Sequence, residues 1–168
     1  MKSIEEQYIE HYNMERIPLE NTYLKKMVLS ETIIDGNNAL SAMIGLFSKE
    51  KGSLSYFHRL SVDEVWTFLD GDPIKLYLLN QDGSVETVVL SDKLEKGHFR
   101  MYHVKPGIWQ AAETTGDFSI YTCNLSPAFS NDVFEGGDES LLDEYPDFRD
   151  IIKSRLPEGK FLPKDYEK

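Results

Sequence analysis

One histidine and one glutamate lie six residues apart in GSLSYFHRLSVDEVWTFLDG, the stretch from residue 52 to residue 71. Side chains of a β-strand alternate between its two faces, so His58 shares a face with Leu60, and Glu64 shares a face with Trp66. We expect these large apolar side chains to point into the core and to carry His58 and Glu64 inward with them. A buried carboxylate is costly unless it is paired, so an inward Glu64 requires a partner: His58, a metal or a ligand.

The strand that carries Glu64 could also be oriented with its opposite face toward the core. If Glu64 turned outward, Val65, Thr67 and Leu69 would fill the core instead. Because both faces carry apolar side chains, we expect both to be buried, one in a barrel interior and the other against a subunit interface or a packed helix. This pattern predicts a homodimer in which sheet packs against sheet.

Short apolar runs of five to nine residues predict the elements that must hold the histidine and the glutamate. Turn residues separate the runs, among them Asp82-Gly83, which is a strong hairpin signal. Eight strands at steady spacing, without helical patterns between them, predict an all-β antiparallel sandwich or barrel. The runs span residues 39–47, 54–60, 64–69, 74–79, 85–90, 99–104, 108–112 and 118–125.

Short helices are predicted on both sides of this core. Ser3 followed by Glu6 forms a capping-box pattern that begins an amphipathic helix. After Pro127 the strand pattern stops, and Pro146 can open a helix near the end of the chain. The further predicted elements are a helix over 4–14, a strand over 23–29, and helices over 139–145 and 147–156.

The length of 168 residues fits one domain, with a barrel core over about 23–135 and a C-terminal helical extension over about 136–168. The single cysteine, Cys123, can close no intrachain disulfide, which suits a reducing compartment. No stretch approaches 18 apolar residues, and the N-terminal residues lack the apolar core of a signal peptide. We therefore expect a cytoplasmic protein.

The net charge of −11 and the pI near 4.8 limit the possible partners. Phosphate groups would be repelled, so nucleic acid is not expected as a partner, and an anionic membrane surface is disfavoured for the same reason. Much of the acidity lies in residues 132–150. We interpret this run as a solvated face, with a docking patch for a basic partner as the alternative.

The spacing around the histidine resembles the first motif of the cupin barrels, G-x5-H-x-H-x3-E-x6-G. Gly52, His58, Glu64 and Gly71 occupy its positions with the same spacing, and Leu60 stands where the second histidine would be. The second cupin motif ends in P-x-G-x2-H. The segment KPGIWQ keeps the glycine of this motif and has a glutamine in place of its histidine.

Residues 40–138 also resemble single-domain cupins that carry an H-R-x-x-x-D-E-x-W signature and are often labelled predicted sugar epimerases. The resemblance implies a double-stranded β-helix, or jelly-roll, barrel. It also implies a pocket for a small polar metabolite, such as a sugar or a nucleotide-sugar.

Two kinds of chemistry follow from this resemblance. In cupins that use a metal, the matching ligands here would be His58, Glu64 and Gln110, a set that favours Mn, Fe or Ni over a closed zinc site. Without a metal, His58 is a base oriented by Glu64, and it can remove a proton next to a ketone, as sugar epimerases of this architecture do. A tyrosine commonly returns the proton there, and Tyr56 and Tyr121 are the candidates.

The remaining candidate residues have two interpretations each. Trp66 and Trp109 fit a core position or a platform for a sugar ring, and His103 fits a surface position or a ligand contact. Gln110 is expected as a polar contact at the cavity mouth. The chain is therefore interpreted as an isomerase or epimerase, with a ligand-binding protein without turnover as the alternative.

Overall fold

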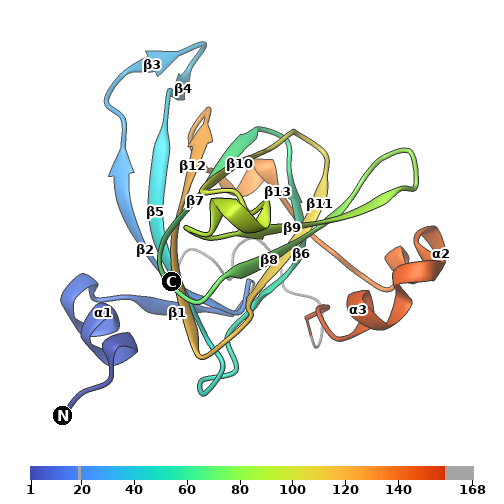
Figure 1. Ribbon diagram of the computed structural model, residues 1–168. Coiled ribbons are helices and arrows are strands. Elements are labelled where there is room, and N and C mark those ends of the chain that lie inside the picture. The colour runs from blue at the N-terminus through green and yellow to red at the C-terminus, as the bar shows by residue number, and fades with distance from the viewer. Residues whose placement is uncertain (19, 158–168) are drawn as a thin grey trace.

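Two antiparallel β-sheets pack face to face and enclose most of the apolar core (Figure 1). The structure is a computed structural model that describes residues 1–18 and 20–157. The larger sheet has the order β1 (Glu15–Ile17), β2 (Thr22–Leu29), β5 (Ser41–Ser48), β12 (Phe118–Ser126), β7 (Asp63–Gly71) and β10 (Met101–Val104). The smaller sheet has the order β13 (Phe134–Gly136), β6 (Ser55–Leu60), β11 (Trp109–Thr114), β8 (Ile74–Leu79) and β9 (Val85–Leu90).

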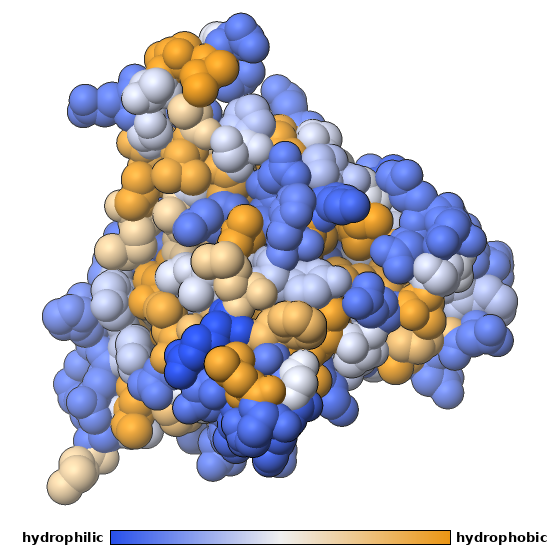
Figure 2. Space-filling view, turned by 45° about the horizontal axis from the view of Figure 1, so that its top comes forward, coloured by the Kyte–Doolittle hydropathy of each residue, from blue (hydrophilic) through white to orange (hydrophobic). Residues whose placement is uncertain are grey.

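A small hairpin of β3 (Ile33–Ile34) and β4 (Asn37–Asn38) extends beyond the larger sheet, where it connects β2 to β5. Asp35 and Gly36 form its turn, both with positive φ. The apolar group coloured orange at the top of Figure 2 lies over this hairpin. Ile33 and Ile34 are both exposed, so the hairpin presents apolar surface to solvent.

Helices lie outside the two sheets. α1 (Ile4–Tyr12) begins with the predicted capping box between Ser3 and Glu6, and it ends where Asn13 takes a left-handed conformation. The other helices are η1 (Leu94–Lys96), η2 (Asn131–Val133), α2 (Leu141–Glu144), η3 (Pro146–Phe148) and α3 (Arg149–Lys153), of which the η elements are 3-10 helices. Within residues 1–18 and 20–157, no helix is long and apolar enough to cross a membrane.

The predicted all-β architecture is confirmed, and each of the eight predicted apolar runs contains most of a strand. β13 was not predicted, because three residues give too little alternation to read; it pairs with the second half of β6. The helix predicted over 147–156 is shorter and is divided into η3 and α3, since the backbone at Phe148 leaves the helical region. The part of the predicted C-terminal extension beyond residue 157 lies outside the described residues.

Helices cover part of the outer face of each sheet, which accounts for apolar residues on both faces of several strands. α1 packs Tyr8 near Leu46 of the larger sheet. The C-terminal helices place Leu141 and Ile152 in a cluster with Phe57 on the outer face of the smaller sheet. A packed helix therefore covers β5 and β6, whereas on the outer face of β7, where the sequence pattern predicted a covering, Leu69 is 46% exposed.

A stack of three aromatic rings fills the centre of the larger sheet's inner face. The ring centroid of Tyr121 lies 4.6 Å from that of Phe47 and 4.8 Å from that of Trp66. The Tyr121 hydroxyl lies 2.9 Å from Thr22 Oγ1. Gly45 pairs with Tyr121 in the β5–β12 register, and the tyrosine ring occupies the space that a side chain at position 45 would need.

Replacing Gly45 with alanine should lower the free energy of unfolding by about 1–3 kcal/mol, because the added methyl group overlaps the Tyr121 ring in a close-packed core. Urea denaturation measures this loss. Gly136→Ala is the matched control, since a Cβ there would meet the Phe134 ring at an ordinary 3.8 Å. Equal stabilities of the two variants would contradict the packing constraint.

Candidate functional site

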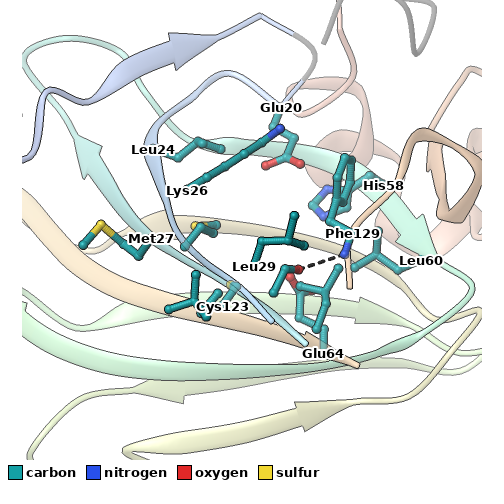
Figure 3. A pocket seen from close by; sticks show the side chains of 15 residues that line it. Glu20, Leu24, Lys26, Met27, Leu29, His58, Leu60, Glu64, Cys123 and Phe129 are labelled. Carbon is teal, nitrogen blue, oxygen red and sulfur yellow. Dashed lines mark hydrogen bonds between the residues drawn. The ribbon is translucent and has the colours of Figure 1, made fainter. Parts of the chain in front are cut away.

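A cavity of about 280 Å³ opens between the two sheets, beside β2 (Figure 3). Apolar side chains form most of its wall, and Glu20, His58 and Glu64 supply buried polar groups. The volume is near the lower end of the range for ligand pockets, about 300–1,000 Å³. The lining residues are Glu20, Leu24, Lys26, Met27, Val28, Leu29, Ser41, Ala42, Met43, His58, Leu60, Glu64, Cys123, Leu125 and Phe129.

His58 reaches the cavity from β6 and is only 4% exposed. Its Nδ1 lies 2.8 Å from the carbonyl oxygen of Tyr56, and because a carbonyl can only accept, Nδ1 carries the proton. In the neutral ring this leaves a lone pair on Nε2. The imidazole also stacks on Phe134, with ring centroids 5.3 Å apart and an interplanar angle of 14°. The ring is therefore held by a hydrogen bond and by stacking, with one nitrogen left as a base.

A β-bulge lies in β6 directly before His58. Between the pairs Gln110–His58 and Ala112–Ser55, β6 has two residues where β11 has one. Such a bulge interrupts alternation and re-aims the side chains that follow it. From Phe57 onward the alternation is regular, so Phe57 packs among the C-terminal helices and His58 faces the cavity on the other side of the sheet.

Glu64 faces the cavity from β7 and is 4% exposed, whereas Leu69 on the same strand is 46% exposed, so the alternative with an outward Glu64 is wrong. Its Oε2 accepts a hydrogen bond from the indole N–H of Trp66 at 3.2 Å and from the amide of Gln110 at 2.5 Å. The Gln110 Oε1 accepts from the same indole at 2.9 Å. These two side chains supply the partners that a buried carboxylate requires, and His58 adds electrostatic attraction.

Burial raises the pKa of the Glu64 carboxyl group, because desolvation penalises its charged form. The nearby His58 and the hydrogen bond from Gln110 oppose this rise, and the Glu20 carboxylate adds to it. Burial also raises the pKa of the Cys123 thiol well above its usual value, with Glu64 adding to the effect. Cys123 therefore lines the wall as a small uncharged residue.

The residues that the cupin resemblance implies as metal ligands do not fit a metal centre. Both ends of the Gln110 amide are engaged, one by the Trp66 indole and the other by Glu64. Leu60, in place of a second histidine, has no donor atom. In the described part of the chain, no three His, Cys, Asp or Glu side chains are grouped as a metal site requires. His58 and Glu64 are left for acid–base chemistry or for ligand binding.

Neither candidate tyrosine belongs to the cavity wall. Tyr121 is buried in the aromatic stack with its hydroxyl bonded to Thr22, and burial raises its pKa well above the usual value. Tyr56 was expected on the same face as His58, but the bulge in β6 changes the alternation between them. Tyr56 is half-buried and contributes its backbone carbonyl to His58 instead.

Three other candidates are also placed differently from the prediction of a ligand contact. Trp109 lies on the outer face of the smaller sheet, where the guanidinium carbon of Arg59 is 4.5 Å from its ring centroid. His103 is exposed on β10, and its Nε2 lies 2.6 Å from Asp63. Gln110 is fully buried rather than at the cavity mouth, because its amide hydrogen-bonds to the buried Glu64.

Sequence reasoning missed Glu20, Lys26 and Phe129, all of which line the cavity. The Nζ of Lys26 lies 5.9 Å from the ring centroid of Phe129, and Figure 3 shows the lysine side chain extending toward Glu20. Lys25 and Lys26 are adjacent in a strand, so alternation places the side chain of one of them on the inner face. This pattern could have indicated that a lysine lines the cavity. Glu20 and Phe129 lie in loops, where no periodicity indicates the direction of a side chain.

The stability of a Glu64→Gln variant should depend on pH differently from that of the wild type. Because the folded-state pKa of Glu64 is raised above its unfolded value of about 4.3, the folded state binds the proton more tightly, so this carboxyl lowers wild-type stability as the pH rises through the raised pKa. Urea denaturation across this range should show that the free energy of unfolding of Glu64→Gln rises relative to that of the wild type as the pH increases. This difference in free energy should shrink toward about pH 4.

Glu95→Gln is the matched control, because Glu95 is an exposed carboxylate on η1. The Glu64→Gln difference from the wild type should change with pH more than the Glu95→Gln difference does. Equal pH dependence of the two differences would contradict a raised pKa for Glu64.

The chain is similar to solved structures over nearly its whole length. A protein from Shewanella oneidensis, known from an X-ray crystal structure, is 28% identical over 94% of this chain and 100% of that one, with a TM-score of 0.86. A hypothetical protein from Leishmania major is 25% identical over 91% of this chain and 98% of that one, with a TM-score of 0.81. KdgF from Halomonas is 12% identical over 74% of this chain and 94% of that one, with a TM-score of 0.53, and shares the fold alone.

No curated protein matches the sequence. A match to a protein-family model covers residues 6–136, from α1 to the end of β13, and includes the strands that carry His58 and Glu64. The family is described as Cupin superfamily (DUF985). The two packed sheets are accordingly a cupin fold, and the chain belongs to this family of the cupin superfamily.

Proposed function

We propose that the cavity binds one small metabolite that has an apolar body and a polar group, and that His58 contacts the polar group. The observation that carries this proposal is the hydrogen bond from Nδ1–H of His58 to the Tyr56 carbonyl, which places the lone pair of the neutral ring on Nε2. Leu24, Leu60 and Leu125 line the same cavity and offer an apolar surface to the body of the ligand.

The volume and wall of the cavity narrow the class of ligand. About 280 Å³ favours a molecule no larger than a monosaccharide, and a nucleotide-sugar is too large. Each buried hydroxyl group needs a hydrogen-bond partner, and the mainly apolar wall offers few of them. A partly apolar metabolite therefore fits better than a fully hydroxylated sugar.

Proton transfer is a second candidate function, favoured by the carboxylate of Glu64 facing the same cavity as His58. Epimerisation returns the proton to the opposite face of one carbon and therefore needs a second group, yet neither Tyr56 nor Tyr121 lines the cavity. His58 can remove the proton from the hydroxyl-bearing carbon and return it on the same face to the neighbouring carbonyl carbon, while Glu64 transfers the hydroxyl proton to the carbonyl oxygen; together these two transfers are isomerisation. Isomerisation of a small hydroxy-ketone or hydroxy-aldehyde is therefore an enzymatic candidate beside epimerisation, for which Glu20 or Glu64 would have to supply the second group.

Ligand binding should depend on His58. A panel of monosaccharides and small hydroxy- and keto-acids, screened by ligand-observed NMR, should contain a binder whose affinity falls at least about tenfold, or about 1.4 kcal/mol, in His58→Gln. The control His103→Gln should bind as the wild type does, because His103 is exposed and lies outside the cavity. A panel without a binder, or a binder held equally by His58→Gln, would overturn the proposal.

The same samples in D2O separate the two candidate functions. Deuterium incorporated at a carbon of the bound molecule, and lost in His58→Gln, would favour proton transfer. Binding without incorporation would favour a ligand-binding protein without turnover.

We also propose that two copies of the chain pair through the end of β2. β1 pairs with Thr22–Leu24 only, so among the described strands β5 is the one neighbour of the Met27–Leu29 end. The exposed apolar residues Met27–Leu29, Ile33 and Ile34 lie at this edge and on the adjoining hairpin. An antiparallel strand edge is complementary to its own copy across a two-fold axis, which favours a second copy as the occupant. This arrangement is edge to edge rather than the sheet-against-sheet packing expected from the strand pattern.

Leu29→Lys should break this pairing, because it places a charge at the proposed interface. Light scattering after size-exclusion chromatography should give about twice the chain mass of 19.3 kDa for the wild type and the single-chain mass for the variant. Leu94→Lys is the control, since Leu94 is 61% exposed and Leu29 is 62% exposed. A wild type with the mass of one chain would refute the homodimer.

A further inference from the structure

We infer that the C-terminal segment, residues 137–157, positions His58 by holding the backbone of the residue before it, and that Arg155 is the positioning residue of this segment. The inference deepens the proposed function, because it concerns how the base in the cavity keeps its orientation. It assigns a role in the site to residues on the opposite side of the smaller sheet.

The backbone of Phe57 is held on both of its polar groups by the C-terminal segment. Its N–H donates to the carbonyl oxygen of Arg155 at 2.9 Å, and its carbonyl oxygen accepts from the N–H of Gly137 at 2.7 Å. These bonds occur at the bulge of β6, where the ladder to β11 is irregular. The segment therefore supports β6 where its regular pairing is interrupted.

The fixed backbone at Phe57 sets the geometry of His58. The Nδ1–H of His58 donates to the carbonyl of Tyr56, so this hydrogen bond links the two residues that flank Phe57. A rotation of the peptide groups at Phe57 would move this carbonyl relative to the imidazole ring. The bonds from Arg155 and Gly137 oppose that rotation.

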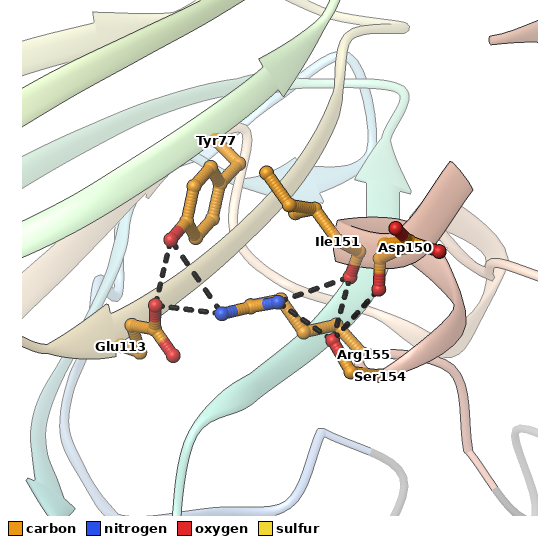
Figure 4. Close-up of polar contacts among 6 residues, drawn as sticks. All are labelled: Tyr77, Glu113, Asp150, Ile151, Ser154 and Arg155. Atoms are coloured by element: carbon orange, nitrogen blue, oxygen red, sulfur yellow. Dashed lines mark hydrogen bonds and ion pairs between the residues drawn. The ribbon is translucent and has the colours of Figure 1, made fainter. Parts of the chain in front are cut away.

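The side chain of Arg155 fixes the position from which its own carbonyl reaches Phe57 (Figure 4). One Nη lies 2.6 Å from Glu113 Oε1, and the guanidinium carbon is 4.7 Å from the centroid of the Tyr77 ring. The other Nη donates to the carbonyl of Ile151 at 3.0 Å. The guanidinium group thus joins α3 to two strands of the smaller sheet.

Tyr77 completes this contact. Its hydroxyl donates to the same oxygen of Glu113 at 2.6 Å. Burial and the neighbouring Glu113 raise the pKa of Tyr77 to about 12, so the hydroxyl keeps the proton that it donates. The ion pair is partly buried, with side-chain exposures of 12% for Arg155 and 25% for Glu113, which limits screening by solvent.

The double variant Arg155→Met with Glu113→Gln removes the ion pair without leaving one buried charge unpaired. Two NMR measurements on the ligand-free protein test the inference: hydrogen exchange of the Phe57 amide, and the tautomer of His58 from its ring nitrogen shifts. We expect exchange at least about tenfold faster and a loss of the pure Nδ1–H tautomer. Tyr145→Phe is the control, because it removes a bond from the same segment to the Asn80 carbonyl and leaves Arg155 intact.

A double variant in which Phe57 exchanges faster while the His58 tautomer is unchanged would overturn the inference and leave the segment a purely structural role. The same conclusion follows if Tyr145→Phe changes the tautomer as strongly, or if the double variant changes neither measurement. If the double variant does not fold, Tyr77→Phe takes its place, with changes in the same directions expected and no change overturning the inference. Failure of the wild type to bind any metabolite would instead count against the proposed function, because these measurements need no ligand.

Discussion

The burial of one carboxylate constrains much of the interior of this protein. Glu64 can lie between the sheets because Trp66 and Gln110 both donate hydrogen bonds to it. Trp66 is in turn held by the aromatic stack through Tyr121, and Gln110 by its register opposite His58. The stack, the β6–β11 register and the polar part of the cavity therefore form one connected arrangement, in which fixed donors offset part of the desolvation cost of the carboxylate.

The two sheets contribute the two groups of the site separately. His58 comes from β6 of the smaller sheet, and Glu64 comes from β7 of the larger one. Their relative position depends on how the sheets pack, not on the six residues that separate them in the chain. The hydrogen bonds that join Gln110 on β11 of the smaller sheet to Glu64 and Trp66 on β7 of the larger one are among the contacts that fix this position.

Regular alternation made much of the fold predictable from the sequence. It placed Glu64 and Trp66 on the inner face of β7, and the turn residues separated the apolar runs that became strands. Alternation also predicted Tyr56 on the same face as His58. That prediction did not account for the bulge in β6, which adds one residue and has no recognisable sequence pattern. Trp109 could not be assigned to a face in advance, since both faces of its strand are buried, one in the barrel and one under the C-terminal helices.

The mutual bonds of Trp66, Gln110 and Glu64 bear on how this site could change during evolution. Each of the three side chains contacts the other two, so a change in one leaves two buried partners with fewer bonds, and the effects of substitutions are not additive. Histidines at positions 60 and 110 would restore the metal-binding pattern of other cupins, but the substitution at 110 removes both bonds of the Gln110 amide. Any path toward such a pattern therefore includes a step that removes the hydrogen bonds which Gln110 forms with Trp66 and Glu64.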